Sequence, residues 1–290
     1  METIKNSSGV LFIVATPIGN LEDITMRGLR VLKEVDLIAA EDTRRTRQLL
    51  SHYGIHKPLI SYHEHNRRAR AESLLAALRE GKNIALVTDA GTPGISDPGE
   101  HLVRRAIQEA VSIIPVPGPS ALIAALSVSG LPTESFLFYG FLPSNSTGRR
   151  KLLLSLKDRP ETLIFYESPK RLTAFLEEAS HILGQRQIVL AREMTKVYEE
   201  IYRGTAAELF REMGEEDVKG EVTIVIEGCT TPAKVESSSI AEMLEFYFHE
   251  TGLSMKEAIE RVSAELDVPR REVYGESLKI KAKIPERKTR

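Results

Sequence analysis

One stretch of the chain, residues 83–99, does most to limit the fold; it reads Asn83-Ile-Ala-Leu-Val-Thr-Asp-Ala-Gly-Thr-Pro-Gly-Ile-Ser-Asp-Pro-Gly99. Its apolar start is typical of a parallel strand that is covered on both faces. The small residues that follow let a ligand approach the backbone, and Asp89 supplies a fixed acceptor. We expect Asp97 to cap the next helix. Ligands of open α/β sheets bind outside the carboxyl ends of strands, so we expect a site here. A turn with only a structural role is the alternative.

The rest of the first half alternates strand and helix patterns. Strands are expected at 10–14, 37–40, 59–63, 84–87 and 111–116. Such alternation predicts an α/β domain with a largely parallel sheet. Past Gly130 the pattern changes, and only some of the next strands, at 136–139, 162–166, 188–191, 200–203 and 222–226, are separated by helices. We therefore predict an N-terminal domain over 1–122 and a second α/β domain with a mixed sheet over 123–230.

The C-terminal part, 231–290, has a different character. The segment 228–239 is polar and contains Pro232 and three consecutive serines, which is typical of a linker. Two helical patterns joined by a short turn at 267–270 follow it. This spacing resembles a helix-turn-helix, although helical hairpins without any role in nucleic-acid binding are common.

Composition limits the classes of protein that need to be considered. The 290 residues are 42% hydrophobic and 28% charged, with a net charge of −2. They contain neither an apolar run of membrane-spanning length nor a signal-peptide core. The single cysteine, Cys229, fits a reducing compartment, so we expect a cytoplasmic protein. The charge does not indicate a nucleic-acid binder as a whole, but local basic patches are compatible with it.

Several polar and aromatic residues are candidates for a site. Glu41 and Asp42 are followed closely by three arginines at a strand exit, where they either hold a polar substrate or pair with one another. Tyr62, Tyr139 and Tyr166 either stack on an unstacked base or fill the core. The run His63-Glu-His65 lacks the further ligands that a zinc site needs, so we expect no metal.

Seven motifs occur in a consistent order between Gly9 and Gly228, and together they identify a family resemblance. The motifs are Thr16-Pro-Ile-Gly-Asn-Leu-Glu-Asp-Ile-Thr25, Ala40-Glu-Asp-Thr-Arg44, Ser61-Tyr-His-Glu-His-Asn66, Thr88-Asp-Ala-Gly-Thr-Pro93, Ser96-Asp-Pro-Gly99, Val116-Pro-Gly-Pro-Ser120 and Tyr166-Glu-Ser-Pro-Lys-Arg171. With these motifs, the chain closely resembles the bacterial small-subunit ribosomal RNA cytidine-2′-O-methyltransferases, a branch of the tetrapyrrole-methylase superfamily.

This resemblance implies S-adenosylmethionine as the methyl donor, held in a cleft between two α/β domains of the tetrapyrrole-methylase type. It also implies a homodimer that acts on 16S ribosomal RNA or the small ribosomal subunit. The first turn departs from the superfamily, because Thr16-Pro-Ile-Gly replaces the more usual Gly-x-Gly. The donor-binding positions implied are Pro17, Gly19, Asp89, Gly91, Thr92, Pro93, Ser120, Ala121, Tyr166, Leu190 and Ala191.

The implied reaction is an in-line attack by a ribose 2′-hydroxyl on a sulfonium methyl group, so the protein must mainly align the reacting atoms. An acceptor for the hydroxyl proton contributes a further factor of roughly 10² to 10⁴. Glu41, Asp42 and Glu193 are the candidate acceptors. The candidate phosphate contacts are Arg44, Arg45, Arg47, Lys170, Arg171, Arg192 and Lys196.

Two other functions compete with this one. One is a methyltransferase of the same superfamily that acts on a tetrapyrrole, which would need a wide cleft and fewer arginines directed at phosphates. The other is a non-catalytic nucleotide- or RNA-binding module, which would transfer no methyl group.

Overall fold

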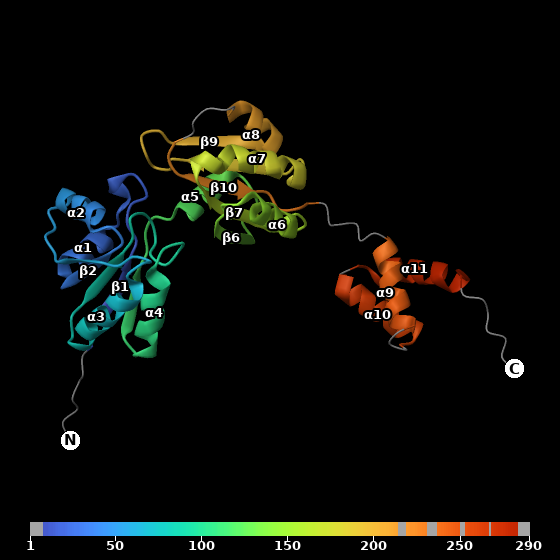
Figure 1. Ribbon diagram of the computed structural model, residues 1–290, viewed down its shortest axis with the longest axis horizontal. Helices are drawn as coiled ribbons and strands as arrows, with labels where there is room; N and C mark the ends of the chain where they lie inside the picture. Colours follow the sequence, from blue (N-terminus) through green and yellow to red (C-terminus); the bar gives the residue numbers. More distant parts are fainter. Residues whose placement is uncertain (1–7, 214–218, 231–236, 250–252, 267, 284–290) are drawn as a thin grey trace, which may run out of the picture. The chain divides into compact units, whose positions relative to one another are not determined.

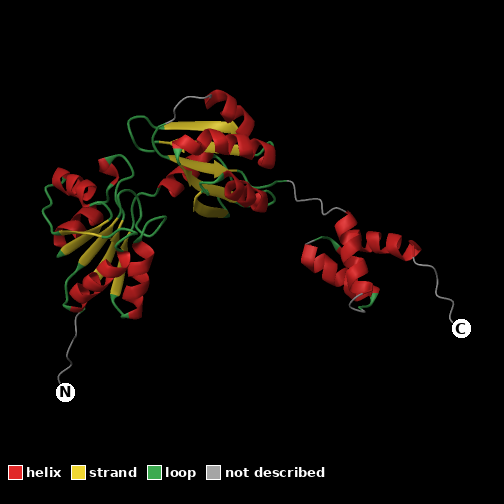
Figure 2. Cartoon of the chain, in the orientation of Figure 1, coloured by secondary structure: helices red, strands yellow, loops and turns green. Residues whose placement is uncertain are grey.

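The computed structural model describes residues 8–213, 219–230, 237–249, 253–266 and 268–283 (Figure 1). The chain divides into two compact units, Met1–Cys229 and Thr230–Arg290. Among the described residues, the strands all lie in the first unit and the second unit contains helices and connecting turns (Figure 2). No helix in these described segments is long and apolar enough to cross a bilayer.

The first sheet of unit 1 has five strands, which are all parallel to their neighbours and lie in the order β3-β2-β4-β1-β5. The strands are β1 (Val10–Val14), β2 (Leu37–Ala40), β3 (Leu59–Ser61), β4 (Ile84–Val87) and β5 (Ser112–Val116). They agree closely with the predicted ranges, because buried parallel strands have short apolar runs.

Helices cover both faces of this sheet. Ile84 and Leu86 of β4 pack with the helices on one face, whereas Ala85 and Val87 pack with the helices on the other. The first pair of helices is α3 (Arg67–Arg79) and α4 (Gly99–Gln108), and the second is α1 (Met26–Glu34) and α2 (Thr43–His52). A short 3-10 helix, η1 (Leu21–Asp23), precedes α1. The helices therefore leave uncovered the edge of the sheet where the strands have their carboxyl ends and the following turns begin.

The second sheet is mixed, in the order β6-β7-β10-β8-β9, with β6 parallel to β7 and the other neighbours antiparallel. Its strands are β6 (Phe136–Phe141), β7 (Thr162–Glu167), β8 (Gln187–Arg192), β9 (Glu200–Thr205) and β10 (Val222–Ile226). All five were expected. The helices of this half are α5 (Ala121–Ser129), α6 (Ser146–Leu156), α7 (Pro169–Leu183) and α8 (Ala206–Met213).

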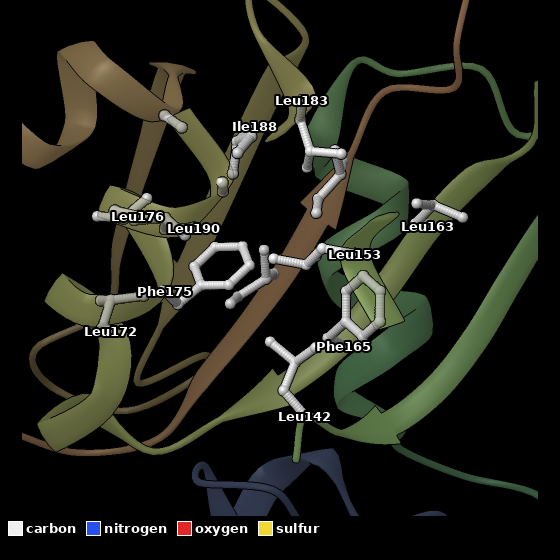
Figure 3. Close-up of a cluster of buried hydrophobic side chains, with 14 of the residues drawn as sticks. Leu142, Leu153, Leu163, Phe165, Leu172, Phe175, Leu176, Leu183, Ile188 and Leu190 are labelled. Carbon is white, nitrogen blue, oxygen red and sulfur yellow. The ribbon is translucent and has the colours of Figure 1, made fainter. Parts of the chain in front are cut away.

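The two faces of the second sheet are covered unequally. One face packs against α6, α7 and α8 and forms the largest cluster of buried apolar side chains, including Phe165 and Phe175 (Figure 3). The other face packs against α5 alone, through Leu122, Ala125 and Leu126. The first residues of α5 thus pack with the second sheet, so the expected boundary at 122 falls inside a helix of that half.

Local capping explains where several helices begin. Thr25 accepts a hydrogen bond from the backbone N of Gly28 at 3.0 Å, so α1 begins at Met26. Asn145 caps α6 in the same way, accepting from the backbone N of Gly148 at 2.7 Å. Thr205 and Glu208 form a capping box at the start of α8: the backbone N of Thr205 donates to Glu208 Oε2 at 2.8 Å, and the backbone N of Glu208 donates to Thr205 Oγ1 at 3.3 Å.

The second unit is a small bundle with its own core, which includes Ile240, Leu244, Val262 and Val273. Its described helices are α9 (Ser237–His249), α10 (Met255–Leu266) and α11 (Arg270–Lys283). The last two correspond to the predicted helical hairpin. The predicted linker, 228–239, extends too far, because α9 begins at Ser237. Residues 231–236 of this linker lie outside the described part of the chain.

Candidate functional site

A cavity of about 520 Å³, called here the first cavity, lies in unit 1 where turns of the first sheet meet the second sheet. The first sheet contributes the residues after β2 and β4, among them Glu41 and Asp89. The second sheet contributes Tyr166 from β7, Ala191 from β8 and Thr223 from β10. This volume lies within the range of roughly 300–1,000 Å³ that is typical of small-molecule sites.

The turn after β1 and the turn after β4 are joined into one rigid wall. The backbone N of Thr16 donates to the carbonyl of Gly91 at 2.9 Å, and the N of Gly91 donates back at 3.0 Å. The Thr16 hydroxyl donates to the carbonyl of Thr88 at 3.0 Å. Gly91 has φ +81°, a conformation that favours glycine. The Thr92 hydroxyl donates to the carbonyl of Pro119 at 3.2 Å, which ties in the turn after β5.

Two carboxylates are fixed on this wall by backbone and hydroxyl donors. Glu41 Oε2 accepts from the Thr88 hydroxyl at 2.7 Å and from the backbone N of Asp89 at 3.4 Å. Asp89 Oδ1 accepts from the backbone N of Asp42 at 3.0 Å, and its Oδ2 lies 3.5 Å from Arg45 Nη1. Burial raises the pKa of Asp89, and the charge of Glu41 adds to this rise. These bonds hold both carboxylates in defined positions.

Asp97 is a third carboxylate in the lining, and its role differs from the one expected. It does not cap α4: that helix starts at Gly99 after Pro98 and has no side-chain cap. The preceding Ser96 has φ +64°, unusual for a non-glycine residue, and the backbone N of Gly99 donates to the backbone carbonyl of Asp97 at 2.9 Å. Burial raises the pKa of Asp97 to about 6; the nearby hydroxyl of Thr88 opposes the rise, and the charges of Glu41 and Asp89 add to it.

The opposite wall belongs to the second sheet and α5. Ser120 and Ala121 lie at the start of α5, where backbone N–H groups have no partner within the helix. Burial raises the pKa of Tyr166, whose ring meets Phe138 and Phe141 edge to face at 5.0 and 5.6 Å. This wall therefore combines backbone donors with an aromatic and apolar surface.

Two of the three candidate proton acceptors have other roles in the structure. Asp42 is the N-cap of α2, and its bonds to Arg44, at 2.7–3.1 Å, hold the pKa of its carboxyl well below its usual range. Glu193 accepts from Lys196 at 2.7 Å and from the backbone N of Glu221 at 2.9 Å. These donors hold its pKa down although partial burial opposes them. Glu41 is the member of the trio that lines the first cavity.

The expected phosphate-binding residues divide into two groups. Arg171 lies 2.5 Å from the buried Glu167, Arg192 pairs with Glu200, and Lys196 pairs with Glu193 and Glu221. These three side chains are held by carboxylates of the protein. Arg44, Arg45, Arg47 and Lys170 are exposed, although Arg44 also pairs with Asp42.

A second cavity of about 440 Å³ adjoins the first and shares Ile18, Thr88 and Asp89 with it. Arg45, Ala90 and Glu221 also line both. The predicted residues Pro17, Gly19 and Lys196 line only this second cavity. The turn after β1 therefore lines the second cavity, and Ile18 is its one residue that also lines the first cavity.

Several expected residues lie outside both linings. Pro93 is buried within the β4 turn and lines neither cavity, and Leu190 lines neither cavity because side chains alternate along a strand. Its neighbour Ala191 faces the first cavity, whereas Leu190 lies in the core beneath α7 (Figure 3). Tyr62 is a core residue and Tyr139 stacks on Phe165, so neither lines a cavity. No group of described His, Cys, Asp or Glu residues is arranged to hold a metal ion.

Sequence reasoning missed Asp97, Met194, Glu221 and Thr223 as lining residues. Asp97 was visible in the motif Ser96-Asp-Pro-Gly99, but a helix cap explained it equally well. Thr223 carried a usable signal, because it is a polar residue in the middle of the apolar strand β10. Met194 and Glu221 gave none, since only the fold brings them to the cavity.

Comparison with known proteins gives consistent relatives. Residues 10–210 match the tetrapyrrole (corrin/porphyrin) methylases. The ribosomal RNA small subunit methyltransferase I of Halalkalibacterium halodurans is 48% identical over 276 residues, covering 93% of this chain and 95% of the relative. The proteins of that name from Escherichia coli O157:H7 and Thermotoga maritima are 52% and 50% identical, covering 78% and 76% of this chain and 80% and 99% of the relatives.

Solved structures share the fold of unit 1. A cobalt precorrin-4 methyltransferase superposes with a TM-score of 0.59 at 19% identity, covering 78% of this chain and 97% of that chain. A uroporphyrin-III-C-methyltransferase from Thermus thermophilus gives 0.54 at 20% identity, with 75% and 94% covered. Together with the helices of the second unit, these likenesses confirm the predicted fold class.

Proposed function

The chain belongs to the tetrapyrrole methylases, among the relatives named ribosomal RNA small subunit methyltransferase I, and we propose that it methylates the ribose 2′-oxygen of a cytidine in 16S ribosomal RNA. The proposed donor is S-adenosylmethionine. The observation that carries this proposal is a cavity lined by five carboxylates, among them Glu41, Asp89 and Asp97, in a chain whose relatives are named for ribosomal RNA methylation. Cytidine and the 2′-oxygen rest on the motif resemblance.

The chemistry of the first cavity fits S-adenosylmethionine. When bound, this group supplies a methyl on a positively charged sulfur. Glu41, Asp89 and Asp97 line the cavity with Arg45 as the cation of the lining, so the site favours a positively charged ligand. The β4 turn and the start of α5 offer backbone groups for polar contacts, and Ala191, Met194 and Tyr166 offer apolar surface. We propose that these residues, with Gly91, Thr92, Ser120 and Ala121, hold the donor.

We propose Asp97 as the group that accepts the proton of the ribose hydroxyl. It lines the cavity beside Thr88, and its pKa of about 6 is close to the value at which a carboxylate is both ionised and basic near neutral pH. The hydroxyl oxygen gains the methyl group as its proton passes to a carboxylate oxygen of Asp97. Glu41 is the second candidate, because it also lines the cavity and already accepts from Thr88.

The RNA is proposed to approach over α2. Arg44, Arg45 and Arg47 lie at the first turns of this helix, where Arg45 lines both cavities, and Lys170 is exposed at the start of α7. Exposed cations at such positions favour phosphate contacts. The predicted contacts Arg171, Arg192 and Lys196 already neutralise carboxylates of the protein, so we assign them to positioning the loops. The proposed substrate implies a cytoplasmic location.

We also propose that the protein is a homodimer. β6 is an edge strand of the second sheet, and its Phe136, Tyr139 and Phe141 are 38, 39 and 58% exposed. Ile123 of α5 is also half exposed. Exposed aromatic side chains grouped at a sheet edge are typical of an interface. Light scattering should give a dimer mass for the wild type and a monomer mass for Phe141→Glu; a monomeric wild type would refute this assembly.

The two alternatives have weaker support. The tetrapyrrole methyltransferases are 19 and 20% identical to this chain, a level at which a likeness speaks for the fold alone. A non-catalytic module is tested directly by incubating the protein with labelled S-adenosylmethionine and small ribosomal subunits. We expect label in 16S RNA and, by mass spectrometry, one methylated cytidine whose modification disappears when the gene is deleted. Absence of transfer beside an active control enzyme would refute the proposal.

A further inference from the structure

The second cavity offers a place for the acceptor of the reaction. It adjoins the first cavity along a common wall that includes Ile18, Thr88 and Asp89. The two cavities share these lining residues, so a group seated in the second cavity lies beside the first. The donor and the acceptor of a methyl group must be bound side by side, because the reacting atoms have to come into contact.

One side of the second cavity is a face of α2. Arg45, Gln48, Leu49 and His52 line it, and their spacing of three and four residues places them along one side of the helix. The face carries an arginine, an amide, an apolar side chain and an imidazole. His52 packs edge to face on Tyr53 at 4.7 Å, and the Tyr53 hydroxyl donates to the carbonyl of Leu21 at 2.5 Å. These contacts connect the end of α2 with the facing wall.

The facing wall is the β1 turn, from Thr16 to Gly19, together with Leu21. Lys196 and Glu221 close the cavity from the second sheet, and Lys196 Nζ lies 3.0 Å from Glu221 Oε2. The backbone N of Asn20 donates to the Thr195 hydroxyl at 3.0 Å, so the loop that carries Lys196 is attached to the β1 turn. The cavity is therefore bounded by fixed groups on two sides.

We propose that the second cavity receives a single unstacked ribonucleotide of the RNA substrate, with its base against Gln48, Leu49 and His52 and its ribose at the shared residues Thr88 and Asp89, so that the 2′-hydroxyl faces the first cavity, which Asp97 lines. This inference rests on the proposed function. A space of about 440 Å³ suits one nucleotide but is too small for a duplex, so the target base must leave its stack. Gln48 supplies both a donor and an acceptor for a base edge, and Leu49 and Leu21 supply apolar surface for its faces.

A large polyanionic ring is less suited to this cavity. The two strong cations in its lining, Arg45 and Lys196, already lie near Asp89 and near Glu193 and Glu221. Little positive charge is therefore left in this cavity to neutralise the several carboxylates of such a ring. A nucleotide brings one phosphate on each side, which the exposed Arg44 and Arg47 at the rim of α2 can contact.

The test uses Gln48→Ala, His52→Ala and the double variant in the full-length protein. The control is Ser51→Ala, an exposed position on the same helix that does not line the cavity. Methyl transfer from labelled S-adenosylmethionine to small ribosomal subunits gives KM and kcat, calorimetry gives the Kd of the donor, and thermal unfolding confirms that each variant is folded.

We expect each single variant to raise the KM for subunits about three- to tenfold, the effect of losing one hydrogen bond or packing contact, and the double variant to multiply the two. The donor Kd should stay within about twofold of wild type, as should every constant of Ser51→Ala. Unchanged KM and kcat in the folded double variant would overturn this inference and leave the proposed function intact. An equal loss of donor affinity would assign the cavity to the donor instead. A wild type that methylates no RNA would refute the proposed function itself.

Discussion

At the scale of single residues, three of the carboxylates that line the first cavity differ in what holds them. Glu41 accepts from a threonine hydroxyl, and Asp89 accepts from a backbone N–H and lies near Arg45. Asp97 is the most affected by burial, which raises its pKa to about 6. A carboxylate held by donors is suited to binding a cation, whereas one with a raised pKa is suited to accepting a proton. Each therefore has its own expected response to substitution.

The first prediction concerns activity and stability at Asp97. Asp97→Asn should lower kcat by about 10² to 10⁴, because the amide cannot accept the proton. In the folded protein, the pKa of the Asp97 carboxyl lies above the usual value of 3.8, so the folded state binds this proton more tightly than the unfolded state. The ionised side chain therefore costs stability, and that cost grows as the pH rises from about 4 to about 6.

Accordingly, Asp97→Asn should raise the free energy of unfolding at pH 8 by about 1 to 3 kcal/mol, and leave it nearly unchanged at pH 4. In the wild type, kcat/KM should fall as the pH drops below about 6. Urea unfolding at both pH values and a pH–rate profile measure these effects. Glu41→Gln is the comparison; if it abolished turnover while Asp97→Asn retained it, Glu41 would be the base.

The second prediction concerns donor affinity at Asp89. Asp89→Ala removes the acceptor of the Asp42 backbone N and the partner of Arg45, and it leaves Arg45 facing the donor cavity without that carboxylate. We expect calorimetry to show a loss of at least about tenfold in affinity for S-adenosylmethionine, because losing a charge-assisted hydrogen bond costs about 1.5 to 3 kcal/mol. Arg44→Glu should instead weaken RNA binding and spare the donor. Unchanged donor affinity in Asp89→Ala would contradict this assignment.

At the scale of elements, the site depends on loops that belong to different sheets. The β8–β9 loop crosses from the second sheet to the β1 turn, where Thr195 accepts from the backbone N of Asn20. Glu193 and Thr195 in this loop have φ +50° and +64°, so tertiary contacts must hold it in its conformation. Its Met194 lines the first cavity and its Lys196 lines the second. The position of one loop thus affects both proposed substrates.

The third prediction uses the close approach at Gly19. A Cβ added there would lie 2.4 Å from Lys196 Cγ and 2.9 Å from the carbonyl oxygen of Met194. Gly19→Ala should push the β8–β9 loop outward and lower methyl transfer by about tenfold or more, since misplacement by about 1 Å can cost as much as a hundredfold. Gly19 is exposed, so thermal unfolding should change little. Full activity would show that the loop adapts freely.

At the scale of the whole molecule, the chain combines unit 1, which contains the proposed active site, with a separate helical unit. Both proposed substrate cavities lie in unit 1, and the second unit has its own apolar core. The helical unit does contain a surface groove lined by Arg270, Arg271 and Tyr274. Its separate core indicates that unit 1 does not need it in order to fold.

The fourth prediction follows from this division. A protein ending at Cys229 should fold and bind S-adenosylmethionine with a Kd within about twofold of the full chain, because no residue beyond it in the described part of the chain lines the first cavity. Calorimetric scans of the full chain should resolve two unfolding transitions, of which the truncated protein retains one. Loss of donor binding in a folded truncated protein would show that the helical unit contributes to the site.

The sequence by itself determined the elements and the turns of this protein. Apolar runs such as Ile84–Val87, and the turns that follow them, are encoded locally by burial and backbone preference, so strand order along the chain and the mixed second sheet were predictable. The β4 turn was identified for the same reason. Motif resemblance then supplied the family, which the relatives confirm.

Only the tertiary structure decided which side chains share a cavity. Asp97 satisfied the local pattern of a helix cap, but burial beside Thr88 and Tyr166 gave it a different environment. Leu190 and Ala191 are adjacent in sequence and lie on opposite faces of a sheet. Lys196, which resembled a free phosphate ligand, is held by two carboxylates. Local preferences fix the backbone conformation. The direction in which a side chain points and the groups that it contacts depend on residues far away in sequence, and for this reason the second cavity could be found only from the fold.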